Sequence, residues 1–299
     1  MLRTRLLTAA VLAPLILVIV LLGEPWLSLL IGVAAFLALV EVVALLDAAG
    51  YQPPQVLTIL AGMLVTAAGL AAVNDESVGG IFTALVTALD PPGVVAAAVV
   101  AGMLVLGVAA FMRSDPKTGF VTWAMSTFGA AYIGLLLPMI ALLAHLSAPG
   151  GSASTPVGIL GIGSGVAWTL MLVLVVWGYD TGAYLVGRAI GRTRLVEHIS
   201  PSKTVEGLAG GLVVATIGAG IGAALVGLEP WQPLIIGPVV GLAAQAGDLA
   251  ESLLKRAAGR KESGFLVPGH GGILDRIDSF LFAAPVLAGY ALLVAGRAA

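Results

Sequence analysis

The sequence predicts an all-α fold, a polytopic membrane helix bundle with about nine transmembrane helices and a cytoplasmic N-terminus. Three observations predict it: an apolar composition, apolar segments of spanning length, and basic residues confined to one side. Of the 299 residues, 59% are hydrophobic and 10% are charged, whereas about a quarter of a soluble domain is charged. Because a soluble protein of this length needs a charged surface, many segments must face lipid.

Apolar segments of spanning length recur along the whole chain. A transmembrane helix needs about 20 mostly apolar residues. The first segment follows a basic start, as in a signal peptide, but Gly23-Glu24-Pro25 is a poor cleavage site, so we expect this segment to be retained. The apolar run within 74–92 is too short to cross and predicts a loop or an interfacial segment. The expected spans lie near 6–22, 26–46, 56–73, 93–112, 120–146, 166–187, 207–228, 232–253 and 277–296.

The basic residues test this topology, because cytoplasmic loops are enriched in Lys and Arg. With nine spans and an inside N-terminus, thirteen of the 14 Lys and Arg residues fall on the cytoplasmic side, and Arg297 alone falls on the other. A missed span in the middle would spoil this sorting. We therefore expect a multi-pass protein of the cell inner (cytoplasmic) membrane.

Charge is also uneven along the chain. Residues 118–179 contain no Lys, Arg, Asp or Glu, whereas residues 180–278 hold most of the ionisable groups. We therefore divide the chain into N-terminal transmembrane helices, 1–146, and a C-terminal catalytic region, 147–299. The net charge of −2 and a pI near 5.9 argue against a nucleic-acid partner. The absence of cysteine excludes thiol catalysis and thiolate metal sites.

Two polar groups lie next to predicted spans. Asp180 and Tyr184 share a helical face at the end of the sixth span, where a carboxylate is costly unless it is paired or binds a cation. The segment Ser200-Pro-Ser-Lys-Thr204 enters the seventh span and offers hydroxyls, an ammonium group and N–H groups that suit a phosphate. An ordinary helix N-cap at Ser202 or Thr204 explains this segment equally well.

A third group is the strongest. On a helix, Asp248, Glu251, Ser252 and Lys255 share one face at i, i+3, i+4 and i+7. Asp275 and Asp278 form an i, i+3 pair at the start of the ninth span, and the intervening glycines let the chain fold back. Paired carboxylates beside Lys and Arg are typical of Mg²⁺-dependent phosphate chemistry. The alternative is a loop of solvated charges with weak salt bridges.

Two further residues have open interpretations. His270 could act as a general acid or base at neutral pH, or could hold its glycine turn by a backbone hydrogen bond. Glu41 lies deep in the second span, and the cost of burying it makes it a functional candidate whose partner the sequence does not name.

The polar motifs resemble those of the phosphatidate cytidylyltransferase family. The resemblance rests on Ser252-Leu-Leu-Lys-Arg256, Lys261 and His270-Gly-Gly-Ile-Leu-Asp-Arg-Ile-Asp278, together with the upstream motifs, and it covers 180–278. Glu262 departs from the Asp that the family usually carries. The resemblance implies that CTP and phosphatidic acid react at a cytoplasm-facing, Mg²⁺-dependent site to give CDP-diacylglycerol. The expected partners are therefore these two substrates and the surrounding membrane lipid.

On this resemblance we expect Asp248 and Asp275 to hold the metal, with Asp278, Glu251 and Asp180 nearby. Lys255 would join the catalytic set, and a larger group would bind substrate: Ser200, Ser202, Lys203, Thr204, Arg256, Arg276, Ser252, His270, Asp180 and Tyr184. Whether the chain forms a homodimer is left open.

Three other functions compete with this one. An ion-coupled transporter also uses intramembrane carboxylates, but here the halves differ and the polar groups gather at helix ends rather than near the midplane. A phosphotransferase acting on CDP-alcohols would carry a paired-Asp helix motif that is absent. A CTP-dependent lipid-alcohol kinase resembles the family at a distance and stays an alternative.

Overall fold

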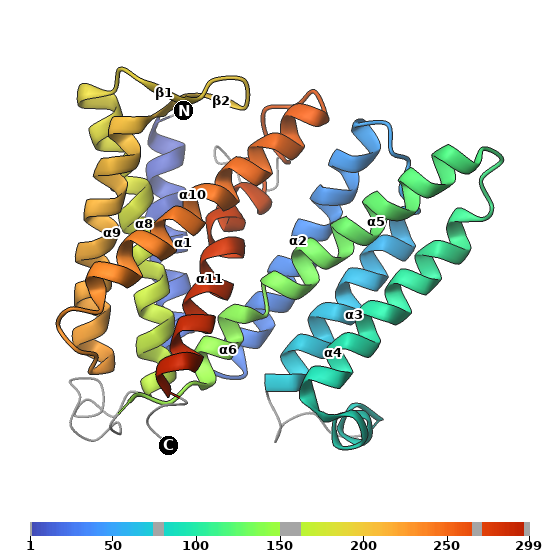
Figure 1. The fold of residues 1–299 in the computed structure, drawn as a ribbon, viewed down its shortest axis with the longest axis horizontal. Helices are drawn as coiled ribbons and strands as arrows, with labels where there is room; N and C mark the ends of the chain where they lie inside the picture. The colour runs from blue at the N-terminus through green and yellow to red at the C-terminus, as the bar shows by residue number, and fades with distance from the viewer. Residues whose placement is uncertain (1, 74–80, 150–162, 265–270, 296–299) are drawn as a thin grey trace. The chain divides into compact units, whose positions relative to one another are not determined.

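The computed structural model describes residues 2–73, 81–149, 163–264 and 271–295, whose regular elements are α-helices apart from one short hairpin (Figure 1). The bounds of the elements are α1 Leu2–Leu22, α2 Trp26–Ala48, α3 Gln55–Val73, α4 Ile81–Ala110, α5 Pro116–Leu136, α6 Met139–His145, α8 Ser164–Ile190, β1 Arg194–Val196, β2 Ser200–Thr204, α9 Val205–Val226, α10 Pro233–Ala257 and α11 Leu274–Ala295.

The predicted membrane helix bundle is confirmed. Within the described residues, eight helices are long and apolar enough to cross a membrane, with α5 and α6 counted together as one 30-residue span. The remaining predicted span is the first, 6–22; it corresponds to α1, whose apolar part, Ala10–Leu22, is shorter. The sequence predicted a loop or an interfacial segment over residues 74–92. In the structure residues 81–89 are helical, and residues 74–80 lie outside the described residues.

A polar residue explains the break that remains in that region. Asp90 has a φ of 59°, and its carboxylate accepts a hydrogen bond from the backbone N–H of Gly93 at 2.8 Å. It therefore caps a new helical stretch that starts with two prolines, which lack the N–H groups that a first turn leaves unpaired. The spanning part of α4 accordingly runs from Asp90 to Ala110.

The chain forms two compact units, the first comprising residues 1–10, 27–141 and 254–276. In it α3, α4 and α5 pack against one another (Figure 1). Apolar side chains fill the contacts, among them Val65 and Val94 between α3 and α4, and Leu106 of α4 with Ala130 of α5.

Asp115 caps the N-terminus of α5. Hydrogen bonds from the hydroxyl and the backbone N–H of Thr118 to the Asp115 carboxylate lower the pKa of that carboxyl below its ordinary value.

The second unit comprises residues 11–26, 142–253 and 277–299. Its α8 and α9 lie side by side, joined by the antiparallel hairpin of β1 and β2 (Figure 1). One face of α9 is exposed and apolar, through Val213, Ile217 and Ile221, as expected for a helix in contact with lipid. The opposite face carries small residues, which let two helix backbones approach closely.

Gly218 is the clearest case of this close approach. A Cβ atom added there would lie 2.7 Å from the carbonyl oxygen of Leu174 on α8, whereas one added at Gly220 would meet nothing within 4 Å. The first glycine is therefore required by packing and the second is not.

We predict that Gly218→Ala lowers the thermal unfolding temperature in detergent, although alanine favours helix by about 1 kcal/mol over glycine. Gly220→Ala, with the same gain in helix propensity and no contact, should leave that temperature equal or higher. Equal effects of the two substitutions would contradict the packing role of Gly218.

Candidate functional site

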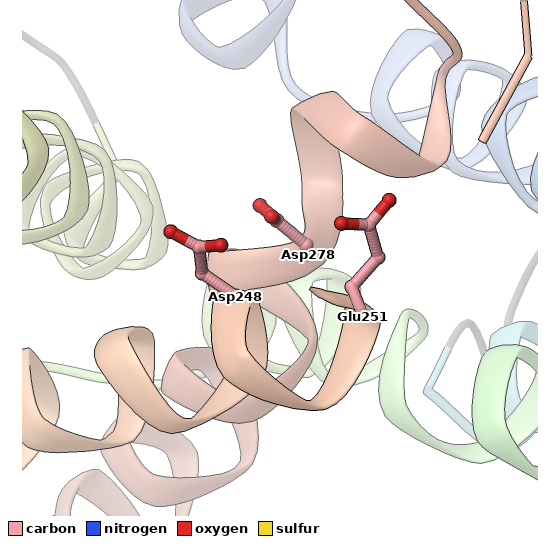
Figure 2. A group of neighbouring side chains, drawn as sticks. All are labelled: Asp248, Glu251 and Asp278. Atoms are coloured by element: carbon pink, nitrogen blue, oxygen red, sulfur yellow. The ribbon is translucent and has the colours of Figure 1, made fainter. Parts of the chain in front are cut away.

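Three carboxylates of the second unit form an acidic cluster. Asp248 and Glu251 lie one turn apart on α10, and Asp278 lies near the start of α11 (Figure 2). One oxygen from each lies within 4.8 Å of the others. Glu251 is fully buried and the two aspartates are partly buried. The set could hold a divalent cation, since hard oxygen ligands are what Mg²⁺ and Ca²⁺ prefer.

A lysine and a serine complete the surroundings of Asp248. Lys203, on β2, makes an ion pair with one carboxylate oxygen, and the Ser252 hydroxyl lies 3.4 Å from the other. Three carboxylates and one ammonium group carry a formal charge of −2, which matches a divalent cation. The predicted helical face of Asp248, Glu251 and Ser252 is thus realised on α10, and the hairpin adds Lys203 to it.

Backbone packing fixes where Asp278 stands. A Cβ atom at Gly247 would overlap the carbonyl oxygen of Asp278, so glycine at that position allows α10 and α11 to approach just before Asp248. The Asp278 carboxylate also accepts the N–H of Ser279 at 2.6 Å. Close backbone contact, rather than sequence spacing, brings Asp278 to the pair on α10.

Asp275 has a different environment, in the first unit. Its Oδ1 binds the Lys255 ammonium group at 2.6 Å, and its Oδ2 accepts the backbone N–H groups of Ser263 and Gly272 at 3.0 and 2.9 Å. The Ser263 hydroxyl lies 2.8 Å from the same oxygen. N–H donors and an ammonium group repel a metal ion, so this arrangement suits an anchor better than a ligand.

Glu41 belongs to the same part of the first unit. Its carboxylate accepts the N–H groups of Ile273 and Leu274 at 3.0 and 2.8 Å and the Ser263 hydroxyl at 2.9 Å. The partner that the sequence left unnamed is therefore the start of α11 together with Ser263. Nothing in the spacing of the sequence pointed to Ser263, whose side chain is buried.

The segment before α9 has a clear structural role at one of its hydroxyls. Thr204 caps α9 by accepting the N–H of Gly207 at 3.1 Å. Glu206 accepts the N–H groups of Arg192 and Thr193, which ties the hairpin to the helix. Ser200 is partly exposed and Ser202 exposed on β2, so both hydroxyls are accessible to a ligand.

The other predicted residues lie at helix ends. Asp180 is exposed on α8, and Tyr184, one turn on, accepts a hydrogen bond from Arg188 at 2.9 Å. Arg256 is exposed at the end of α10 and donates to the Arg260 carbonyl oxygen. Arg276 is exposed on α11. His270 lies outside the described residues.

Sequence inspection missed a buried polar pair, Tyr179 and Gln245. The Tyr179 hydroxyl donates to Gln245 Oε1 at 2.6 Å, and both side chains are buried. Gln245 lies one turn before Asp248 on α10, and within the described residues its Nε2 has no hydrogen-bond partner. Polar residues inside two apolar helices were the available indication.

We predict that Tyr179→Phe lowers the unfolding free energy by about 1–3 kcal/mol, because it removes the hydrogen bond that the buried Gln245 amide accepts within the described part of the apolar bundle. Adding Gln245→Leu should restore much of the loss, since apolar groups then replace both members of the pair. Detergent unfolding of the single and double variants measures this. A double variant less stable than Tyr179→Phe would contradict the account.

A protein-family model matches nearly the whole chain, and individual relatives match about two fifths of it. The model of the cytidylyltransferase family matches residues 3–294. The chain is 47% identical over 125 residues to a phosphatidate cytidylyltransferase of Staphylococcus saprophyticus, covering 41% of this chain and 48% of that protein. The Bacillus subtilis protein of the same name is 46% identical over 125 residues, covering 41% and 46%.

A third relative of that name, from Synechocystis, is 43% identical over 126 residues, which cover 42% of this chain and 43% of the relative. In each comparison the chain spans about half the length of the curated relative that it matches.

Proposed function

The chain belongs to the cytidylyltransferase family, and we propose that it transfers CMP from CTP to phosphatidic acid, giving CDP-diacylglycerol and pyrophosphate. The names of the relatives support this substrate pair. The single observation that carries the proposal from the structure is the acidic cluster of Asp248, Glu251 and Asp278, with Lys203 beside it.

The reaction joins two anions. A phosphate oxygen of phosphatidic acid attacks the α-phosphorus of CTP, the bond from that phosphorus to the bridging oxygen breaks, and pyrophosphate leaves with the electron pair. Because the nucleophile is already ionised, catalysis consists mostly of positioning and charge neutralisation rather than proton transfer. A site of carboxylates, a metal and basic side chains fits that demand.

We assign the divalent cation, which we propose to be Mg²⁺, to Asp248, Glu251 and Asp278. Their oxygen ligands and the formal charge of −2 with Lys203 fit such an ion. Bound there, it would neutralise the CTP phosphates and the departing pyrophosphate. The expected ligand Asp275 instead holds Lys255 in our proposal, since N–H and ammonium donors occupy its oxygens.

The basic and hydroxyl side chains would bind the substrates. Lys203 can shift from Asp248 to a phosphate, and the hydroxyls of the partly exposed Ser200 and the exposed Ser202 offer neutral donors on the same strand. Lys255, Arg256 and Arg276 stay proposed phosphate ligands, with Lys255 held by Asp275. Asp180 and Tyr184 stay proposed neighbours of the site.

The membrane context follows from the spans. We propose that the N-terminus and the site face the cytoplasm, because thirteen of the 14 basic residues fall on that side, and that the protein lies in the cytoplasmic membrane. CTP would enter from the cytoplasm and phosphatidic acid from the inner leaflet.

We predict that the purified protein in detergent moves the α-phosphate label of CTP into lipid when phosphatidic acid and Mg²⁺ are present, and that chelating the metal stops it. Asp248→Asn, which keeps the side-chain shape, should lower the rate about a hundredfold or more by removing a ligand charge. Arg194→Gln, at the exposed first residue of β1, is the control and should stay near wild-type.

Three results would contradict the proposal: near-normal turnover by Asp248→Asn, transfer of a γ-phosphate label from CTP to a polyprenol with no α-phosphate label entering lipid, or solute uptake by proteoliposomes without any lipid labelling. The second would favour a lipid-alcohol kinase and the third a transporter.

A further inference from the structure

The buried carboxylate of Glu41 has no part in the proposed reaction. It lies in the spanning helix α2 with 4% of its surface exposed, where an ionised group is costly unless it is partnered. Its partners come from far along the chain: Oε1 accepts the N–H of Ile273 at 3.0 Å and Oε2 that of Leu274 at 2.8 Å. Ile273 and Leu274 lie at the N-terminus of α11. The first N–H groups of a helix have no partner within the helix, and this end carries a positive partial charge. Glu41 therefore caps α11 from another helix.

A short chain of contacts runs from Glu41 to a basic residue proposed to bind phosphate. The Ser263 hydroxyl lies 2.9 Å from Glu41 and 2.8 Å from Asp275, and Asp275 in turn binds the Lys255 ammonium group at 2.6 Å. The side chains of Lys255 and Asp275 are only 12% and 10% exposed. Ser263 is 2% exposed. The position of Lys255 thus depends on a buried set of contacts with Glu41 at its far end.

The backbone around this set is shaped to admit the carboxylates. A Cβ atom at Gly272 would overlap Glu41 Oε2 and Ser263 Oγ, and one at Gly264 would lie 2.6 Å from Glu41 Oε1. Gly271 has a φ of +80°, which L side chains rarely adopt, and lets the N–H of Gly272 point at Asp275. Glycine at these positions serves the carboxylate contacts.

We infer that Glu41 is a positioning residue for CMP transfer, fixing the start of α11 and, through Ser263 and Asp275, the ammonium group of Lys255. The inference rests on the proposed function, in which Lys255 binds a substrate phosphate. In this role Glu41 acts through Ser263 and Asp275. A glutamine at this position has the same shape, but whichever way its amide lies, the N–H of Ile273 or Leu274 faces an NH₂ group instead of an acceptor.

The test compares Glu41→Gln with Asp47→Asn, which removes an exposed carboxylate from the same helix. Glu41→Gln should lower kcat/KM for CTP, and weaken CTP binding measured without turnover, by roughly tenfold or more, as seen when a group that orients a site residue is removed. Hydrogen exchange at the amides of Ile273 and Leu274 should speed up. Glu41→Asp, which keeps the charge, should recover part of the loss, and Asp47→Asn should change nothing.

A double-mutant cycle separates positioning from general stability. If Glu41 acts through Lys255, then Glu41→Gln adds little to the loss of CTP binding in a Lys255→Met background. Losses that multiply would overturn the inference, as would wild-type binding in Glu41→Gln. If Glu41→Gln fails to fold, Ser263→Ala carries the same cycle, because it removes only the hydroxyl link.

Failure of the proposed function can be told apart from failure of the inference. A wild-type protein that binds CTP but labels no phosphatidic acid refutes the proposed acceptor, while the comparison of CTP binding still tests Glu41. A wild-type protein that does not bind CTP refutes both.

Discussion

The constraint on which this structure depends is that a carboxylate inside an apolar helix bundle must be partnered. Most buried side chains of the described residues are apolar, so each buried acid needs N–H groups, an ammonium group or a metal to offset its desolvation. Glu41 and Asp275 meet this need with backbone N–H groups, Ser263 and Lys255. Asp248 has Lys203, and together with Glu251 and Asp278 it forms a cluster that could hold a cation.

The same constraint gives the two sets of acids different tasks. Donors that approach a carboxylate along its lone pairs fix it in place and leave no room for a metal, which suits an anchor. Carboxylates that gather around one another repel unless a cation joins them, which suits a ligand set. The proposed enzyme therefore combines a rigid support for Lys255 with a set of acids that gains from binding a divalent ion.

Most of the fold could be predicted from the sequence, because hydropathy over about 20 residues is a strong constraint in lipid. The ends of helices could not. Lys255 and Arg256 extend α10 beyond its apolar part, and α11 begins before Ile277, because backbone hydrogen bonding continues where the chain leaves the hydrocarbon. Residues 81–89 are helical rather than a loop, because an apolar run favours a helix even when it is too short to span the membrane.

The site could be predicted only where it lies on one helix. The spacing of Asp248, Glu251 and Ser252 was enough to place them on one face of α10. The sequence-based expectation chose Asp275 over Asp278 as the second ligand, and the spacing could not test that choice, because residues three apart on a helix differ by roughly 60° in direction and meet different neighbours. Asp275 lies in the first turn of α11, within reach of N–H donors, and Asp278 lies beyond it. The contact of Glu41 with Ile273 joins residues 232 positions apart, which no local pattern can reveal.

The central claim is that Asp248, Glu251 and Asp278 hold the divalent cation of the CMP transfer. Anomalous X-ray diffraction from crystals of the protein grown with Mn²⁺ and CTP tests it most directly. The account predicts a manganese peak at about 2.1 Å from oxygens of Asp248, Glu251 and Asp278, the distance that a small divalent ion requires. A peak bound to Asp275, with Asp278 free of metal, would contradict it.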